Sequence, residues 1–183
     1  MFSKDTYINR RRQLIKDVDK GLILFIGNSE SPMNYLDNTY RFRQDSSFLY
    51  FFGLNHPDLI AILDAESGKE IIYGDDYTID HIVWMGNQPT IKERAATCGI
   101  NRTEPSSHIL SELQSAIASG RQVHFLPAYR GDSKIKLFEL LGVFPEKVQE
   151  DFSLELVKAV IKQRNYKTED EVREIETAVN ITV

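Results

Sequence analysis

Apolar and polar positions follow two different rhythms along the first half of the chain. Residues 3–19 place apolar positions at helical spacing behind Ser3, a good cap residue, so an amphipathic helix is predicted there. Short apolar runs predict strands over residues 21–27, 47–52, 59–64 and 70–73. The stretch 28–44 is polar and rich in turn-forming residues, which indicates a long irregular loop. Strands this apolar are typical of a sheet that is covered on both faces.

The second half of the chain is dominated by helical periodicity. Helices are predicted over residues 79–85, 90–98, 105–119, 133–141 and 154–163. Ser153 is the expected cap of the last of these, Gly142 is the expected stop of the one before it, and a further strand is predicted over 122–126. Strands followed by helices predict a mixed α/β fold, with a central sheet flanked by helices.

The end of the sequence predicts the beginning of another helix. Thr168 and Glu171 have the spacing of a capping box, in which each side chain bonds the backbone of the other. An apolar stripe follows at helical spacing: Val172, Ile175 and Val179. The pattern carries no helix-stop residue before Val183. We therefore expect the sequence to be a piece of a longer protein, and the stripe to face a part that is absent here.

Composition and charge restrict the class of protein. Of the 183 residues, 42% are hydrophobic and 27% are charged, as in globular domains. No apolar run approaches the ~20 residues that cross a bilayer, so no membrane partner is expected. The net charge of −5 argues against nucleic acid, because phosphate binding requires a basic surface. The chain turns polar from Ser3 onward, without a signal-peptide core, which favours a cytoplasmic location.

Two local features have simple structural interpretations. The run Arg10-Arg11-Arg12 lies within the first predicted helix, and we expect it to form a solvated face of that helix. Cys98 is the single cysteine, so no internal disulfide can form. It lies near a predicted helix end and is expected to be a small buried apolar residue.

The residues offer no recognisable catalytic centre. Motifs of zinc proteases, phosphate-binding loops and serine hydrolases are missing from the sequence. The densest group of candidate metal ligands is Asp75, Asp76, Asp80 and His81. A polar loop that caps a helix explains this group more simply than a metal site does. We expect no metal site in this chain.

One segment carries a specific resemblance to a known family. The matching positions are Phe42, Arg43, Gln44, Asp45, Ser46, Ser47, Phe48, Tyr50, Gly53, Asn55 and Pro57. In this register they resemble the signature of aminopeptidase P N-terminal domains. Residues 10–14 are similar to the family's first helix, and residues 161–172 to its passage into a catalytic domain. Residues 82–86 are similar to its Trp-containing segment, with Met85 in place of the usual aromatic, and residues 127–152 show the weakest similarity.

The resemblance implies a fold and a chemistry. The family's N-terminal domain has a creatinase-like fold with a ribonuclease-H-like motif, in which helices flank a mixed sheet. A separate pita-bread catalytic domain follows it and binds two metal ions, usually manganese, through two Asp, one His and two Glu; the metal pair activates a water molecule that removes a residue preceding proline. By this resemblance residues 1–163 form the N-terminal domain, and residues 164–183 form a linker and the start of the catalytic domain's first helix. Neither catalytic residues nor metal ligands are then expected here, and this chain alone is expected to be inactive.

The resemblance also implies partners. The family's N-terminal domain packs against its own catalytic domain, serves assembly into a homo-oligomer (a dimer or tetramer), and narrows the entrance for proline-containing peptides. In some members the Trp that matches Trp84 reaches a neighbouring subunit's active site, so Trp84 is a candidate substrate-binding residue. An aromatic ring suits packing against proline. The alternative is that Trp84 is an ordinary core or interface aromatic.

The signature residues have structural interpretations as well. Arg43, Gln44, Asp45 and Ser46 are expected to order the preceding loop through polar bonds or to face a subunit interface, and a buried network between Arg43 and Asp45 is one such arrangement. Tyr50 and its phenylalanine neighbours are expected in the sheet core. Gly53 is expected to end their strand.

Two alternatives remain for the function. The chain could belong to a prolidase or creatinase relative on the same scaffold, although the signature segment favours aminopeptidase P. It could instead belong to a peptidase-like binding module that has lost catalysis. The presence or loss of the five metal ligands downstream of Val183 would separate an enzyme from a binding module.

Overall fold

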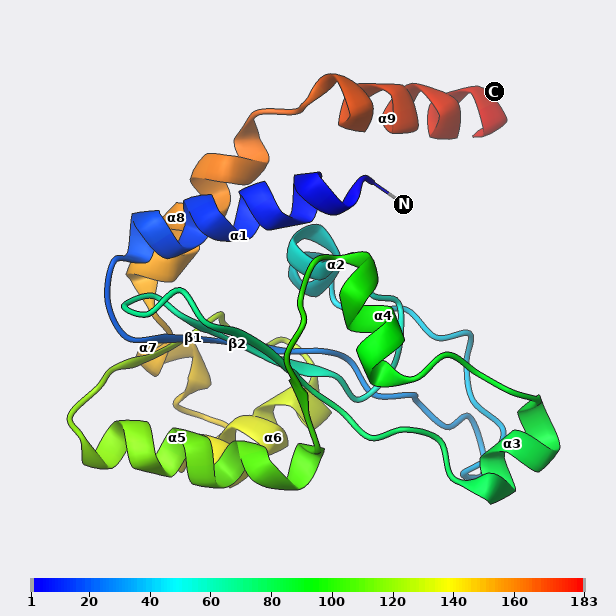
Figure 1. The fold of residues 1–183 in the computed structure, drawn as a ribbon, viewed down its shortest axis with the longest axis horizontal. Helices are drawn as coiled ribbons and strands as arrows, with labels where there is room; N and C mark the ends of the chain where they lie inside the picture. Colours follow the sequence, from blue (N-terminus) through cyan, green and yellow to red (C-terminus); the bar gives the residue numbers. More distant parts are fainter. Residues whose placement is uncertain (1, 183) are drawn as a thin grey trace.

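The computed structural model describes residues 2–182 and shows three layers, a central sheet between two layers of helices (Figure 1). Within this range the sheet has five strands in the order β4-β3-β2-β1-β5. The strands are β1 (Leu22–Ile26), β2 (Ile60–Asp64), β3 (Glu70–Tyr73), β4 (Thr103–Glu104) and β5 (Val123–Phe125). The sheet is mixed, because β1 pairs antiparallel with β2 but parallel with β5, and β3 pairs antiparallel with β2 but parallel with β4. The mixed α/β class predicted from the sequence is confirmed.

The central strands bury both of their faces. In β1, Ile23 and Phe25 point into one core cluster, whereas Leu22 and Leu24 point into the other. Because successive side chains of a strand point to opposite faces, a strand between two helical layers needs an apolar residue at every position. The continuous apolar run of β1 therefore fixes its place at the centre of the molecule.

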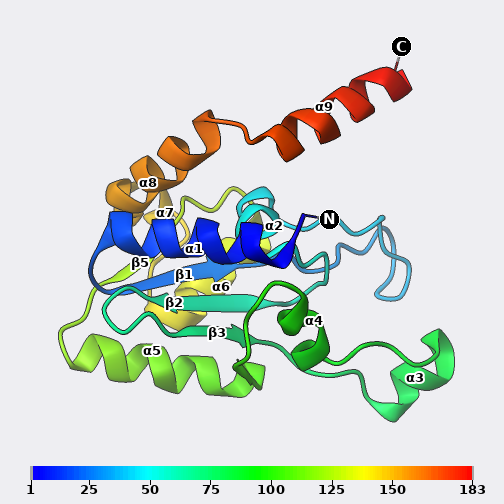
Figure 2. The same cartoon turned by 45° about the horizontal axis from the view of Figure 1, so that its top comes forward.

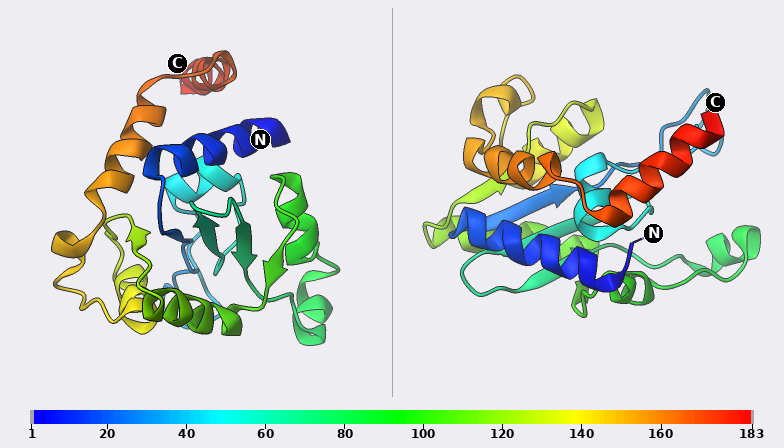
Figure 3. Two further views of the ribbon diagram at one scale, coloured as in Figure 1. Left: turned by 60° about the vertical axis from the view of Figure 1, so that its left-hand side comes forward. Right: turned by 90° about the horizontal axis from the view of Figure 1, so that it is seen from above.

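Helices cover the two faces unequally, as Figure 3 shows from the side. One face carries α1 (Lys4–Val18), α2 (Ser46–Phe52), α4 (Ile91–Thr97) and α8 (Leu154–Asn165). The other carries α5 (Ile109–Ala118), preceded by a short 3-10 turn, with α6 (Gly131–Leu141) and α7 (Val148–Asp151). Two helices project from the body: α3 (Ile79–Met85) and α9 (Glu169–Thr182) (Figures 1 and 2).

The prediction of a strand over residues 47–52 is wrong, because this segment is helix α2. The side chain of Asp45 accepts hydrogen bonds from the backbone N–H of Ser47 and of Phe48 and so caps the helix at its start. Gly53 ends the helix in the left-handed conformation, with φ of 65°. Helical spacing puts the rings of Phe48 and Phe52 on one buried face, with their centroids 4.7 Å apart. The same aromatic residues would suit a strand, but the cap at Asp45 and the stop at Gly53 favour a helix.

The prediction of a solvated arginine face on α1 is correct only for Arg12. Arg10 is 7% exposed and Arg11 is 0% exposed, whereas Arg12 lies in water. The guanidinium of Arg11 donates to the carbonyl oxygens of Phe51 at 2.9 Å and Cys98 at 2.9 Å. It also pairs with Glu70 at 3.0 Å. A buried charge is tolerated where it has such hydrogen-bond and ionic partners. Of the three arginines, Arg12 therefore lies at the surface, whereas Arg10 and Arg11 are buried.

Some smaller features of the fold follow the predictions and others do not. Cys98 is buried at the C-terminal end of α4, as predicted, and burial raises the pKa of its thiol. The sequence did not reveal β4 or α7. None of the helices between residues 2 and 182 is long and apolar enough to cross a membrane. The boundary predicted between residues 163 and 164 falls near the end of α8 and stays a prediction; Met1 and Val183, at the ends of the two predicted ranges, lie outside the described residues.

We expect the substitution Arg11→Met to destabilise the protein by about 3–5 kcal/mol, because it leaves Glu70 and two buried carbonyl groups without their partner. Urea denaturation measures the change. Arg12→Met is the matched control on the same helix, and a change within ~0.5 kcal/mol is expected there. Equal losses in both variants would show that the buried position has no special weight.

Candidate interaction site

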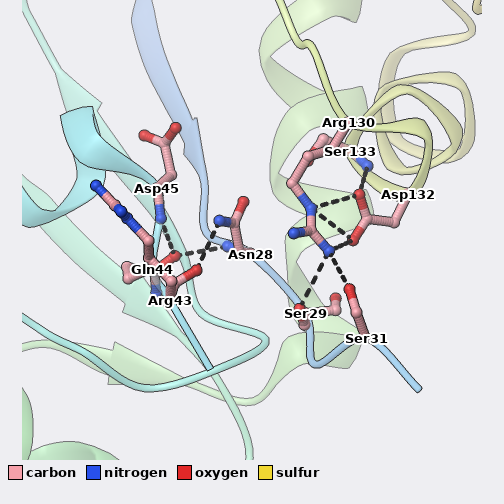
Figure 4. A network of polar contacts seen from close by, with 9 residues as sticks. All are labelled: Asn28, Ser29, Ser31, Arg43, Gln44, Asp45, Arg130, Asp132 and Ser133. Carbon is pink, nitrogen blue, oxygen red and sulfur yellow. Dashed lines mark hydrogen bonds and ion pairs between the residues drawn. The ribbon is translucent and has the colours of Figure 1, made fainter. Parts of the chain in front are cut away.

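The signature segment centres on the buried side chain of Gln44, which is 1% exposed. Its Oε1 accepts hydrogen bonds from the backbone N–H of Asn28 at 2.6 Å and of Asp45 at 2.9 Å, and its Nε2 donates to the carbonyl of His56 at 2.7 Å. The Asn28 side chain in turn donates to the carbonyl of Arg43 at 2.8 Å. One amide therefore joins the end of β1, the start of α2 and the approach to β2; the left part of Figure 4 shows its bonds to Asn28 and Asp45.

The close approach around Gln44 requires a glycine at residue 27. A Cβ atom on Gly27 would lie 2.6 Å from the carbonyl oxygen of Leu59 and 3.0 Å from Nε2 of Gln44. No side chain fits at that distance from a backbone atom. The glycine that ends the predicted first strand therefore serves this crossing of chain segments.

The other signature residues have separate roles. Asp45 caps α2 and Ser46 is its exposed first residue, whereas Arg43 is exposed and contributes its backbone carbonyl. The expected buried network between Arg43 and Asp45 does not form, because Arg43 is exposed. The buried hydrogen bonds of this segment are those of Gln44. Gly53 is required because a Cβ there would clash with the ring of Tyr7. Tyr50 is half-buried on α2 rather than in the sheet core, and burial raises the pKa of its phenol.

A second cluster, missed by sequence reasoning, holds the beginning of the 28–44 loop. Arg130 binds the carboxylate of Asp132 through Nη2 at 2.7 Å and Nε at 3.0 Å. The same Nη2 donates to the hydroxyl of Ser31 at 2.7 Å and reaches the carbonyl of Ser29 at 3.4 Å (Figure 4, right). Their mutual hydrogen bonds raise the pKa of Arg130 and lower the pKa of Asp132, so both stay charged. An arginine two residues before an aspartate at a helix start was the available signal.

A cavity of about 390 Å³ lies where β1 and β5 end, between α2, α6 and α8. Its floor is apolar. Polar residues at its edge are already engaged: Asp45 caps α2, the amide of Asn28 bonds Arg43, and the hydroxyl of Ser47 accepts from Arg164 at 3.3 Å. These bonds explain the polar lining by the local structure, without a ligand.

Helix α3 presents an exposed apolar surface, which we call the α3 patch. No residue of this helix is buried. The patch consists of Ile79, Ile82, Val83, Trp84 and Met85. Trp84 is 88% exposed, so the alternative of an ordinary core aromatic is wrong. Apolar surface gathered in this way is typical of a site that contacts another molecule.

The base of α3 rests on a stack of rings. The ring of Tyr77 lies 5.5 Å from that of His56 and 5.4 Å from that of His81, measured between centroids. His56 is 9% exposed, and burial lowers the pKa of its imidazole. Oγ1 of Thr78 lies 2.8 Å from Nδ1 of His81. Because Gln44 bonds the carbonyl of His56, the signature network also supports the platform on which α3 stands.

The acidic group near α3 serves the backbone. Asp76 accepts from the N–H of Ile91 at 2.6 Å, and Asp75 accepts from the N–H of Ser106 at 3.1 Å. Each carboxylate therefore meets the start of a following helical turn. Among residues 2–182 no group of three or more His, Cys, Asp or Glu side chains is arranged to hold a metal ion.

Comparison with known proteins gives a consistent result. The family model described as "Aminopeptidase P, N-terminal domain" matches residues 7–124. A probable Xaa-Pro aminopeptidase of Aspergillus terreus is 28% identical over 108 residues, covering 59% of this chain and 22% of that protein. The Xaa-Pro dipeptidase of Homo sapiens is 24% identical over 104 residues, covering 55% of this chain and 21% of that protein. The matched part of this chain thus covers less than a quarter of either relative.

Solved structures show the same fold. Aminopeptidase P from E. coli in its low-pH form superposes with a TM-score of 0.74 at 19% identity, covering 94% of this chain and 41% of that one. The aminopeptidase PepP of Pseudomonas aeruginosa superposes with a TM-score of 0.74 at 20% identity, covering 94% and 40%. At these identities the likeness establishes the fold of this chain.

We expect Gln44→Ala to destabilise the protein by roughly 3 kcal/mol, because it leaves buried backbone groups at Asn28, Asp45 and His56 unsatisfied. The amides of Asn28 and Asp45 should exchange with solvent much faster, which hydrogen exchange measures. The exposed Gln114→Ala on α5 is the control and should change neither quantity. If both variants behave like the unmodified protein, Gln44 does not hold these segments together.

Proposed function

Because this chain belongs to the aminopeptidase P N-terminal domain family, we propose that it is the non-catalytic N-terminal domain of a metal-dependent Xaa-Pro aminopeptidase. In this proposal residues 1–163 form the domain, residues 164–183 lead into the catalytic domain, and the parent enzyme acts in the cytoplasm. The catalytic domain supplies the site for two manganese ions and hydrolyses the bond before proline. The role of this chain is assembly of a homo-oligomer and control of the active-site entrance.

The α3 patch is the observation that carries the assembly role. Trp84, Ile79 and Val83 are between 74% and 88% exposed on a helix that buries nothing in its own chain. A helix of seven residues gains little stability by itself. Large exposed aromatic and aliphatic side chains are those that contribute most at the centres of protein interfaces. A second subunit that covers the patch would explain both the exposure and the projection of α3 (Figure 2).

The human Xaa-Pro dipeptidase among the similar proteins supports a second candidate, the corresponding domain of a dipeptidase. The two enzymes differ in the length of substrate they accept. As the names say, an Xaa-Pro dipeptidase acts on Xaa-Pro dipeptides, whereas an Xaa-Pro aminopeptidase releases the first residue of a peptide.

We expect this chain, supplied with manganese, to leave Xaa-Pro-Xaa peptides intact, whereas the longer gene product cleaves them. Release of the N-terminal residue, followed by chromatography, measures both. Cleavage by the longer product of Xaa-Pro dipeptides alone would favour the dipeptidase. No cleavage of either peptide would favour a binding module, and cleavage by this chain alone would overturn the non-catalytic assignment.

We expect Trp84→Ala in the longer protein to weaken assembly and to lower kcat/KM for an Xaa-Pro-Xaa peptide by roughly tenfold, as loss of a central interface aromatic does. Sedimentation velocity and steady-state kinetics measure the two effects. Tyr129→Ala removes an aromatic of comparable exposure (70%) that lies outside α3, and it should leave both unchanged. An oligomer and a rate unaffected by Trp84→Ala would remove the patch from the proposal.

A further inference from the structure

The side chain of Arg10 is held in a cage of aromatic rings on the face of α1. Its guanidinium carbon lies 3.9 Å from the ring centroid of Tyr50, 4.9 Å from that of Phe2 and 5.8 Å from that of Tyr7. Its Nη1 donates to the carbonyl of Tyr50 at 2.8 Å. Cation–π contacts strengthen when the cation is withdrawn from water, and Arg10 is only 7% exposed. The position of this charge is therefore well fixed.

The other terminal nitrogen of Arg10 faces the start of α9. Among the described residues, Nη2 of Arg10 has no hydrogen bond of good geometry. Oε1 of Glu171 lies 3.2 Å from it, and the two side chains are 7% and 12% exposed. The attraction is thus an ion pair withdrawn from solvent, where screening by salt is weak. Loss of Glu171 would leave this buried cation without its counter-charge.

The same carboxylate also begins the helix. Oε2 of Glu171 accepts from the backbone N–H of Thr168 at 2.9 Å and from its hydroxyl at 3.1 Å. The hydroxyl of Thr168 accepts from the N–H of Glu171 at 3.3 Å, which completes the capping box predicted from the sequence. One side chain therefore starts α9 and binds it to α1.

The remainder of α9 stands away from the body (Figure 3). Between residues 169 and 181, Glu171 alone is partly shielded from solvent, and every other residue is exposed. Val172 and Ile175 of the predicted apolar stripe are 41% and 49% exposed. The direction of α9 consequently depends on its first turn.

Tyr50 connects this contact to the end of α8. The guanidinium of Arg164 lies 5.6 Å from the ring centroid of Tyr50 and donates to the hydroxyl of Ser47 at 3.3 Å. Both ends of the segment 164–171 are therefore connected to the ring of Tyr50. Arg164 packs on this ring at one end, and at the other end Glu171 pairs with Arg10, which packs on the same ring. Tyr50, a residue of the signature segment, therefore contacts the side chains that hold both ends.

We propose that Arg10, Tyr50 and Glu171 form an orienting joint, which sets the direction in which α9 leaves the body. Arg10 and Glu171 act as positioning residues, because they fix the helix rather than contact a substrate. The inference concerns this chain alone, so it stands or falls separately from the proposed peptidase role.

The test compares Glu171→Gln with Glu174→Gln in this chain. Glutamine at residue 171 can still cap the helix, so the substitution removes the charge and spares the capping box. Glu174 lies one turn further along α9 and is exposed, which makes it the matched control. Spin labels on Arg12→Cys of α1 and Glu176→Cys of α9, both exposed positions, report the distance between the helices, while the buried Cys98 stays unlabelled.

We expect one narrow distance distribution in the otherwise unmodified protein and in Glu174→Gln, and a distribution at least twice as broad in Glu171→Gln. Amide exchange at residues 171–173 should be about tenfold faster in Glu171→Gln, the factor that corresponds to about 1.4 kcal/mol. The melting temperature of the body should stay the same, since both cores are untouched. A narrow distribution in Glu171→Gln, or equal broadening in both variants, overturns the proposal.

A second pair of variants tests the joint from its other side. Tyr50→Phe keeps the ring under Arg10 and should preserve the narrow distribution. Tyr50→Leu removes the ring and should broaden the distribution as Glu171→Gln does. Equal behaviour of the two variants would exclude the aromatic support.

Discussion

The buried guanidinium of Arg11 is the constraint on which one helical layer depends. It extends from α1 and meets a carbonyl at the end of α2, another at the end of α4, and the carboxylate of Glu70 at the start of β3. Only its Nε lacks a hydrogen bond among the described residues. A charge removed from water costs several kcal/mol unless its donors are met. The elements α1, α2, α4 and β3 must therefore lie close together at Arg11, and the apolar residues of this layer pack next to it.

Sequence patterns predicted β1, β2, β3 and β5, because a strand buried on both faces must be apolar throughout, whereas the two-residue β4 leaves no such run. The strand predicted over residues 47–52 is a helix, because these residues satisfy both periods and the decision rests on the cap of Asp45 and the stop of Gly53. The burial of Arg10 and Arg11 gave no local signal. The carbonyl partners of Arg11 lie 40 and 87 residues away, so a charged run looked like a solvated face.

The signature residues were named from the sequence, whereas their hydrogen bonds and ring contacts were not predictable from it. The signature pointed to Gln44, Asp45, Tyr50 and Gly53. Asp45 bonds its own neighbours in sequence, whereas Gln44, Tyr50 and Gly53 contact residues that only folding brings near. Gln44 is buried and joins three chain segments by hydrogen bonds, so it does not face an interface. The ring of Tyr50 packs against the charged side chains of Arg10 and Arg164. Arg130 lies in the stretch of weakest similarity to the family, and its contacts to the 28–44 loop were not predictable because they join residues about 100 positions apart. The exposure of Trp84 follows from the short helix that carries it, in which no residue is buried.

The parallel pairing of β1 with β5 has a consequence for how the chain acquires its structure. Leu22 pairs with Val123, about 100 residues later, although β1 is the second element to be synthesised. Until β5 is available, one edge of this apolar strand has open hydrogen-bonding groups, the kind of edge at which chains associate wrongly. Pairings so distant in sequence slow folding, because a long loop must close before any contact is gained. The β1 side of the sheet is thus begun early on the ribosome and completed late, and in that interval the nascent chain is most open to aggregation.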